Sequence, residues 1–150
     1  MDKQQLSIDT FRNGFNCAQS VFSVLSEDLD IDRNTALKLA TPFGAGIAYM
    51  QETCGAVSGA LMAIGLKYGK GENGTNEDKE RAYDMSKHFI NEFTNCFGSV
   101  TCKELMEGHN MSTPEGMSRI MELDLFRVKC AVHVKTAVEI AGKIIGRDMA

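Results

Sequence analysis

Features that would interrupt helices or build a β-sheet are scarce in this chain of 150 residues. Proline occurs only twice, at Pro42 and Pro114, so long helices are possible over most of the sequence. No segment alternates apolar and polar residues with the β-branched enrichment of a half-buried strand. A repeat of about 20–50 residues, the mark of a solenoid, is also missing. These absences predict an all-α fold.

An excess of positive charge is missing too. Sixteen basic and twenty acidic residues give a net charge of −4, which argues against a general nucleic-acid binder. Two longer uncharged stretches, residues 39–51 and 53–66, are rich in glycine. Both are shorter than the ~20 apolar residues that a membrane-spanning helix needs. The N-terminus has no basic region followed by an apolar run, so we expect no signal peptide and a cytoplasmic location.

The length and composition predict one globular domain over residues 1–150. Hydrophobic residues make up 43% of the chain and charged residues 24%, which is ordinary for a folded domain. Capping residues and apolar periodicity predict a single bundle of about five to six helices, with a Gly-rich loop at residues 41–46 before the central helix. The expected helical regions are residues 3–27 with a break at 13–14, 33–40, 54–68, 78–97 and 124–145, with further helix starts at Thr101 and at Thr113-Pro114.

Sequence motifs of common cofactor sites are lacking. There is no Cys-x-x-Cys pair, which argues against a zinc ribbon, a ferredoxin-type cluster motif and a thioredoxin motif. Without Cys-x-x-Cys-His, no covalent haem is expected. Gly44-x-Gly46 lacks the third glycine of a dinucleotide fingerprint, and no P-loop or Gly-x-Ser-x-Gly elbow occurs. The sequence therefore predicts neither haem nor nucleotide.

Five cysteines are the chemically informative residues. In a reducing compartment they are more commonly free thiols, metal or cluster ligands, or a cycling redox pair than structural disulfides. Cys17, Cys54 and Cys102 each follow a residue of the capping type; these three residues are Asn16, Thr53 and Thr101. The pattern places three thiols in the first turn of three helices, where the helix dipole and free N–H groups would lower the thiol pKa.

The alternative to a functional role is a structural one, in which each cysteine is a small buried hydrophobic residue. Cys130-x-x-His133 spans one helical turn and could place two ligands on one side, although such a histidine is more commonly a core or surface residue. The nine methionines are better explained as fillers of core gaps than as copper ligands.

Four segments together resemble a known family. Residues 13–21 read NGFNCAQSV, residues 54–66 read CGAVSGALMAIGL, residues 97–105 read FGSVTCKEL, and Lys129-Cys130 follows late in the chain. This order and context of four cysteines resembles the small C_GCAxxG_C_C proteins over about residues 10–145. A single Cys-Gly-Ala would not be specific, but the four cysteines in this order are.

The resemblance implies an all-helical fold, a redox role and frequent encoding beside transporter genes, hence a link to a membrane transporter. Its four cysteines correspond to Cys17, Cys54, Cys102 and Cys130. Cys96 falls outside the pattern, and we expect it in the core on the face of Phe93 and Phe97. The family also resembles the helical domain of split-Soret cytochromes, which combine haem with an iron–sulfur centre. Because this chain lacks the haem-attachment motif, the resemblance to these cytochromes implies at most the iron–sulfur centre and not the haem.

Three functions stay open at this point. The four cysteines could bind an iron–sulfur cluster, most simply [2Fe–2S], in an electron carrier with an unknown redox partner. They could instead be the catalytic thiols of an oxidoreductase that exchanges disulfides without metal. The third alternative is structural zinc or a helical partner-binding module without redox chemistry. The small-residue face of residues 54–66 could pack within the monomer or across a homodimer.

Overall fold

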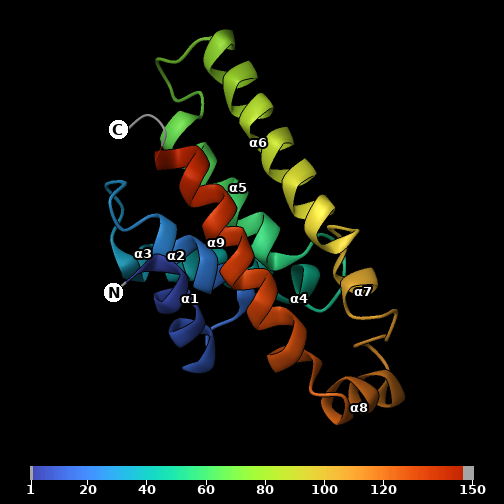
Figure 1. Cartoon of the computed structure of the whole chain (residues 1–150). Helices are drawn as coiled ribbons and strands as arrows, with labels where there is room; N and C mark the ends of the chain where they lie inside the picture. The colour runs from blue at the N-terminus through green and yellow to red at the C-terminus, as the bar shows by residue number, and fades with distance from the viewer. Residues whose placement is uncertain (1, 147–150) are drawn as a thin grey trace.

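The computed structural model describes residues 2–146, and within them the chain forms helices without a named β-strand (Figure 1). The all-α prediction is confirmed. The number of helices exceeds the predicted five to six, because residues 98–130 form several short elements. The elements are α1 (Lys3–Arg12), α2 (Cys17–Leu25), α3 (Arg33–Ala40), the 3₁₀ turn Thr41–Phe43, α4 (Gly44–Ile47), α5 (Gly55–Tyr68), α6 (Asn76–Phe97), α7 (Cys102–Leu105), α8 (Pro114–Glu122), the π-helix Phe126–Cys130 and α9 (Ala131–Gly146).

Most helix starts follow the predicted capping residues. Asn16 and Gln19 form a capping box at the start of α2. The Asp32 carboxylate accepts from the Thr35 N–H before α3, and the Thr113 hydroxyl accepts from the Gly116 N–H before α8. Each side-chain oxygen satisfies a backbone N–H that has no partner within its helix. The break predicted at residues 13–14 separates α1 from α2.

One predicted helix start and one predicted capping box are wrong. The long helix α6 begins two residues before the predicted Asp78, since Thr75 forms its capping box with Asp78. The capping box predicted for Thr101 and Glu104 does not form among residues 2–146. Thr101 instead pairs with Thr53 in an isolated antiparallel bridge, and its N–H donates to the Ser99 hydroxyl.

The core lies where α5 packs among α2, α6 and α9. Small residues of α5 allow a close approach to α2, because a Cβ on Gly59 would lie 2.8 Å from the Ala18 carbonyl oxygen. The small-residue face of α5 therefore packs within the monomer. On the opposite side, α6 contributes Phe89 and Phe93, which are fully buried with ring centroids 5.9 Å apart.

The predicted apolar face of the last helix is buried, and the predicted helix over about residues 124–145 is confirmed, because residues 125–146 are helical without a break. Four residues of this face, Val134, Val138, Ala141 and Ile145, are buried in α9. Before α9, the chain forms a π-helix over Phe126–Cys130. A π-helix holds one residue more per turn than an α-helix and is frequent at functional sites. It ends at Cys130.

Cys96 is exposed, so its predicted place in the core is wrong. It lines a surface pocket between α6 and α9, together with the polar side chains of Glu92, Thr136 and Lys143. The polar residues along this edge keep it open to solvent, whereas Phe93 on the neighbouring face is fully buried.

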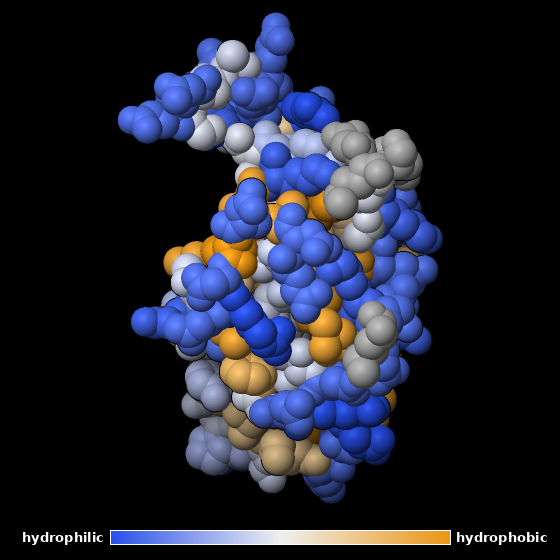
Figure 2. Space-filling model, turned by 90° about the vertical axis from the view of Figure 1, so that its left-hand side faces the viewer, coloured by the Kyte–Doolittle hydropathy of each residue, from blue (hydrophilic) through white to orange (hydrophobic). Residues whose placement is uncertain are grey.

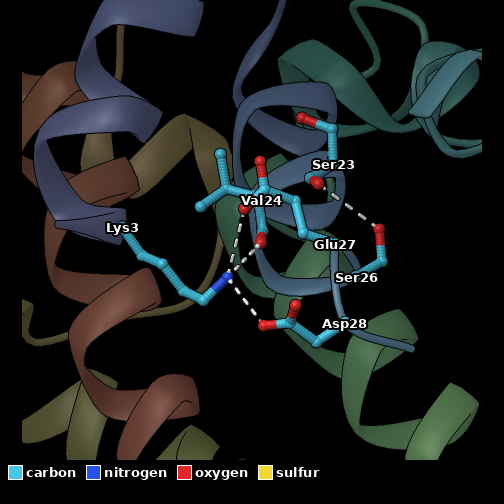
Figure 3. A network of polar contacts seen from close by, with 6 residues as sticks. All are labelled: Lys3, Ser23, Val24, Ser26, Glu27 and Asp28. Atoms are coloured by element: carbon cyan, nitrogen blue, oxygen red, sulfur yellow. Dashed lines mark hydrogen bonds and ion pairs between the residues drawn. The ribbon is translucent and has the colours of Figure 1, made fainter. Parts of the chain in front are cut away.

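Polar contacts tie α1 to the end of α2 (Figure 3). The Lys3 ammonium donates to the Val24 carbonyl at 3.1 Å and pairs with Glu27 at 3.3 Å and Asp28 at 3.6 Å. A cation at the C-terminal end of a helix is favoured by the helix dipole. These contacts fix α1 beside the body of the molecule.

The surface is largely hydrophilic on the face that Figure 2 shows, with hydrophobic residues in separate patches. At the top of that view, a mainly hydrophilic projection corresponds to the loop before α6 and the start of α6 in Figure 1. Within residues 2–146, no helix has both the length and the apolar composition needed to cross a bilayer.

Candidate functional site

The four cysteines of the motif line one cavity of about 200 Å³. They come from four separate segments: Cys17 begins α2, Cys54 precedes α5, Cys102 begins α7, and Cys130 ends the π-helix. Residues far apart in the sequence are thus brought together by the tertiary structure. Cys96 is not among the lining residues.

Apolar side chains form much of the rest of the cavity wall. Met106 is 1% exposed, and its Sδ lies 3.6 Å from the Cys130 Sγ. Met106 and Met111 belong to a small core cluster with Cys102, Ile120 and Leu125. The expectation that methionines fill core gaps is confirmed for these two, and the gap that they fill adjoins the cysteines. The remaining lining residues are Phe11, Asn16, Ala45, Tyr49, Gly55, Leu105, Phe126 and His133.

Three of the thiols lie at helix N-termini, as predicted, but Thr53 is not the cap of α5. Cys17 and Cys102 are the first residues of their helices, and Cys54 is the N-cap of α5. The backbone N–H groups of Ala56 and Val57 are directed at the Cys54 sulfur, and those of Ala45 and Gly55 at the Cys17 sulfur. Such N–H groups stabilise negative charge on sulfur.

Backbone hydrogen bonds hold Cys54 and Cys102 in neighbouring segments. The Cys54 N–H donates to the Val100 carbonyl at 2.7 Å, and the Cys102 N–H donates to the Glu52 carbonyl at 2.7 Å. Together with the antiparallel bridge between Thr53 and Thr101, these bonds place Cys54 opposite Val100 and Cys102 opposite Glu52, one residue beyond the bridge in each segment. The start of α5 is therefore fixed to the start of α7.

Gly55 shows why a glycine follows Cys54. A Cβ at this position would collide with the Cys17 sulfur and lie 2.8 Å from the Phe43 carbonyl oxygen. Only a residue without a side chain lets α5 begin this close to Cys17. The Cys-Gly pair thus brings the first two cysteines to the same cavity.

The predicted lowering of the thiol pKa values is wrong for the free thiols. Burial raises the pKa of the Cys17 thiol despite the N–H groups directed at it. Burial, together with the neighbouring Cys17 thiol, also raises the pKa of Cys54, and it raises that of Cys102 to about 12. For Cys130, burial again comes first, followed by repulsion from the other three cysteines. An apolar cavity disfavours thiolates more strongly than helix N-termini favour them.

His133 lines the cysteine cavity, whereas the sequence favours an ordinary core or surface histidine at this position. Its ring packs edge-on against Phe97 with centroids 4.7 Å apart, and the residue is 4% exposed. Burial, and then the positive charge of Lys129, lowers the pKa of His133 to about 4. The imidazole is therefore neutral at pH 7. The only sequence signal was its spacing from Cys130, which placed both on one side of a helix.

The donor set suits a group that thiolates bind. Within residues 2–146, no group of three or more His, Cys, Asp or Glu side chains is arranged to hold a single metal ion. The four cysteine thiols nevertheless line one cavity with apolar walls, and backbone N–H groups are directed at two of them. In a [2Fe–2S] cluster each iron takes two protein ligands, so its four cysteines need not surround a single point. The thiols present match that cluster in number and type.

A sequence model of the family described as "Putative redox-active protein (C_GCAxxG_C_C)" matches residues 15–144, so this chain is a member of that family. The resemblance carried by the four motif segments is thereby confirmed. Searches of curated proteins and of solved structures found no match to the chain.

Proposed function

We propose that this member of a redox-active family is an electron carrier whose four motif cysteines bind an iron–sulfur cluster, most simply [2Fe–2S]. The observation that carries the proposal is the convergence of Cys17, Cys54, Cys102 and Cys130 on one cavity. Such a cluster takes four cysteine ligands, and the cavity offers four cysteines from four separate segments. When bound, the cluster would supply one-electron transfer.

The surroundings of the cysteines support this proposal. Met106 and Met111 are buried in the cavity wall, and burial influences the potential of a bound cluster. The N–H groups of Ala45 and Gly55 are directed at the Cys17 sulfur, and hydrogen bonds to sulfur stabilise negative charge on it. The protein would therefore bind the cluster and adjust its potential.

Disulfide exchange without metal is less well supported by the same site. An exchanging thiol must ionise and reach its partner. Cys54 and Cys102 are only 6% and 7% exposed, and burial raises the pKa of both thiols. Structural zinc would require four ligands around one point at about 2.3 Å, an arrangement that residues 2–146 do not present.

The proposal includes a cytoplasmic location and a separate redox partner that accepts or supplies the electron. A link to a membrane transporter is part of what the family resemblance implies. The partner itself is defined only by chemistry, as a one-electron donor or acceptor.

Single Cys→Ser variants test which thiols bind the cluster. We expect Cys17→Ser, Cys54→Ser, Cys102→Ser and Cys130→Ser each to lower the iron and sulfide content of protein purified without oxygen. Cys96→Ser is the matched control, because Cys96 is exposed and outside the cavity; it should retain iron at the level of the unmodified chain. Loss of iron in Cys96→Ser with full retention in Cys130→Ser would contradict the assignment of ligands.

A further inference from the structure

The segment before Cys54 has an unusual backbone. Residues 45–49 all have positive φ, with values of 54°, 66°, 70°, 49° and 67°. Four of the five are not glycine, and Ile47 is β-branched. A left-handed conformation costs a non-glycine residue about 1–2 kcal/mol, so a run of this length is costly. Strained backbone persists where the surrounding structure enforces it, and it concentrates at functional sites.

This left-handed turn lies against the cysteine cavity. Ala45 and Tyr49 are lining residues, and a Cβ on Gly46 would lie 2.7 Å from the Cβ of Cys102. On the other side, Gly44 packs against the side chain of Asn16, which directly precedes Cys17. Figure 1 shows α4, the start of this turn, next to α7 near the C-terminal end of α6. The turn therefore runs across the segments that carry the thiols.

Hydrogen bonds hold the turn at both ends. The buried Gln51 amide donates to the His109 carbonyl at 2.8 Å and accepts from the Met111 N–H at 2.7 Å. Its backbone N–H donates to the Ala45 carbonyl at 3.2 Å. Before the turn, the Asn16 amide donates to the Thr41 carbonyl at 2.9 Å.

Between these two anchors, Gly44 and Gly46 are buried, whereas residues 47–50 are exposed to solvent. Tyr49 is 59% exposed although it lines the cavity, and Met50 is 67% exposed. Residues 47–50 lose few buried contacts when the segment moves outward, and the segment gives up backbone strain at the same time, whereas the buried Gly44 and Gly46 favour the closed position. Burial and the Gln51 hydrogen bonds favour the closed position, whereas the strain favours opening.

We propose that residues 44–51 form a strap that opens and closes the cysteine cavity, with the Gln51 side chain as its latch. The strap controls when small reagents, including iron and sulfide donors, reach Cys17 and Cys102. The strap would regulate the site of the proposed function, and its biological role therefore depends on that function. Its motion, however, can be measured on the chain without metal.

The test is the rate at which N-ethylmaleimide alkylates each cysteine of the reduced, metal-free full chain. Peptide mass spectrometry reports the individual rates, and exposed Cys96 is the internal standard in every sample. Gln51→Ala removes both hydrogen bonds of the latch, and we expect Cys17 and Cys102 to react about tenfold faster relative to Cys96. Unchanged rates in Gln51→Ala would overturn the latch.

Ala48→Gly gives a prediction of the opposite sign. Glycine adopts φ of 49° without strain, so the closed strap becomes more stable and the cavity cysteines should react about fivefold more slowly. Ala82→Gly in α6 is the matched control: the same change in a right-handed helix should not slow the reaction. Faster alkylation in Ala48→Gly would overturn the strap, even if Gln51→Ala failed to fold.

The outcome is separable from that of the proposed function. A chain that never binds iron, yet shows the opposite effects of Gln51→Ala and Ala48→Gly, has the strap without the cluster. A chain that binds iron, yet shows neither effect, has the cluster without the strap.

Discussion

Two regions of this molecule are built in different ways. The helical body, defined as α2, α5, α6 and α9, consists of right-handed helices around the main core. The site region, defined as residues 41–54 and 98–130, consists of short helices, turns and a π-helix. Within residues 2–146, all non-glycine residues with positive φ except Asp30 lie in the site region; they are Ala45, Ile47, Ala48, Tyr49, Gln51, Glu107 and Asp124.

The two regions are stabilised by different interactions. In the helical body, the burial of apolar side chains such as Phe93 and Val134 provides the stabilisation. In the site region, backbone hydrogen bonds hold Cys54 and Cys102, and part of the backbone is strained. Substitutions in the body should therefore change stability above all, whereas substitutions in the site region should change the site.

The largest effect on stability is expected from Phe93→Ala. Phe93 is fully buried and packs against Phe89 and Phe97, so its truncation should lower the free energy of unfolding by about 3–5 kcal/mol. Urea denaturation at 10 °C measures this loss. The folded fraction should keep its iron. Loss of iron from folded Phe93→Ala protein, at a level similar to Cys54→Ser, would remove the distinction between the two regions.

Two glycines on α5 offer a matched comparison. Gly55→Ala places a Cβ against the Cys17 sulfur and the Phe43 carbonyl, and we expect it to cost about 2–3 kcal/mol and to abolish iron binding. At Gly65 the added Cβ would have no heavy atom of the described chain within 4 Å. Gly65→Ala should therefore stabilise the protein by about 0.5–1 kcal/mol. Equal changes in the two denaturation midpoints would show that the site end of α5 is not tightly packed.

A pH dependence follows from His133, which belongs to α9 of the helical body and lines the cysteine cavity. Its pKa falls from the usual 6.5 to about 4 in the folded protein because of burial. The unfolded chain then binds a proton below pH 6.5 that the folded chain does not, so stability is lost as the pH falls from 6.5 towards 4. From these two values, the loss between pH 7.5 and pH 5 is about 2 kcal/mol.

Urea denaturation at both pH values measures this loss, and His133→Phe is the control. The variant lacks the titrating group, while the carboxylates that titrate elsewhere are retained. Its stability should fall by about 2 kcal/mol less than that of the unmodified chain over the same pH range. An identical pH dependence of the two proteins would exclude His133 as its source.

The smallest effects concern two helix caps. The Thr75 hydroxyl accepts from the Asp78 N–H at the start of α6, so Thr75→Ala should cost about 1 kcal/mol. The side chain of Thr101 caps no N–H within residues 2–146, so Thr101→Ala should cost less than about 0.5 kcal/mol. Thermal unfolding of the two variants under identical conditions compares them. A larger loss in Thr101→Ala would mean that the hydroxyl caps α7 in solution.

The helical body could be predicted from the sequence because its signals are local. Capping residues such as Asn16 and Asp32 precede helices at the predicted places, and apolar spacing predicted the buried face of α9. Cys96 is the exception. Helical spacing placed it near Phe93, but burial depends on what a neighbouring element covers, and α9 leaves this edge open.

The site region could be predicted only in part. The motif and the helix starts identified the four cysteines that line the cavity. The left-handed turn was expected only as a Gly-rich loop, because residues such as Ile47 and Tyr49 normally disfavour positive φ. Gln51 carries no local signal and His133 only its spacing from Cys130, since the roles of both depend on contacts with distant segments. The raised thiol pKa values depend on burial, which the capping pattern does not report.

The proposed cluster is tested most directly by the absorption spectrum of the full chain purified without oxygen, with iron, sulfide and zinc analysis of the same sample. The account predicts bands between about 320 and 450 nm, iron and sulfide in equal amounts, and loss of both in Cys54→Ser. A colourless protein without iron, obtained from anaerobic purification and again after reconstitution with iron and sulfide, would contradict it.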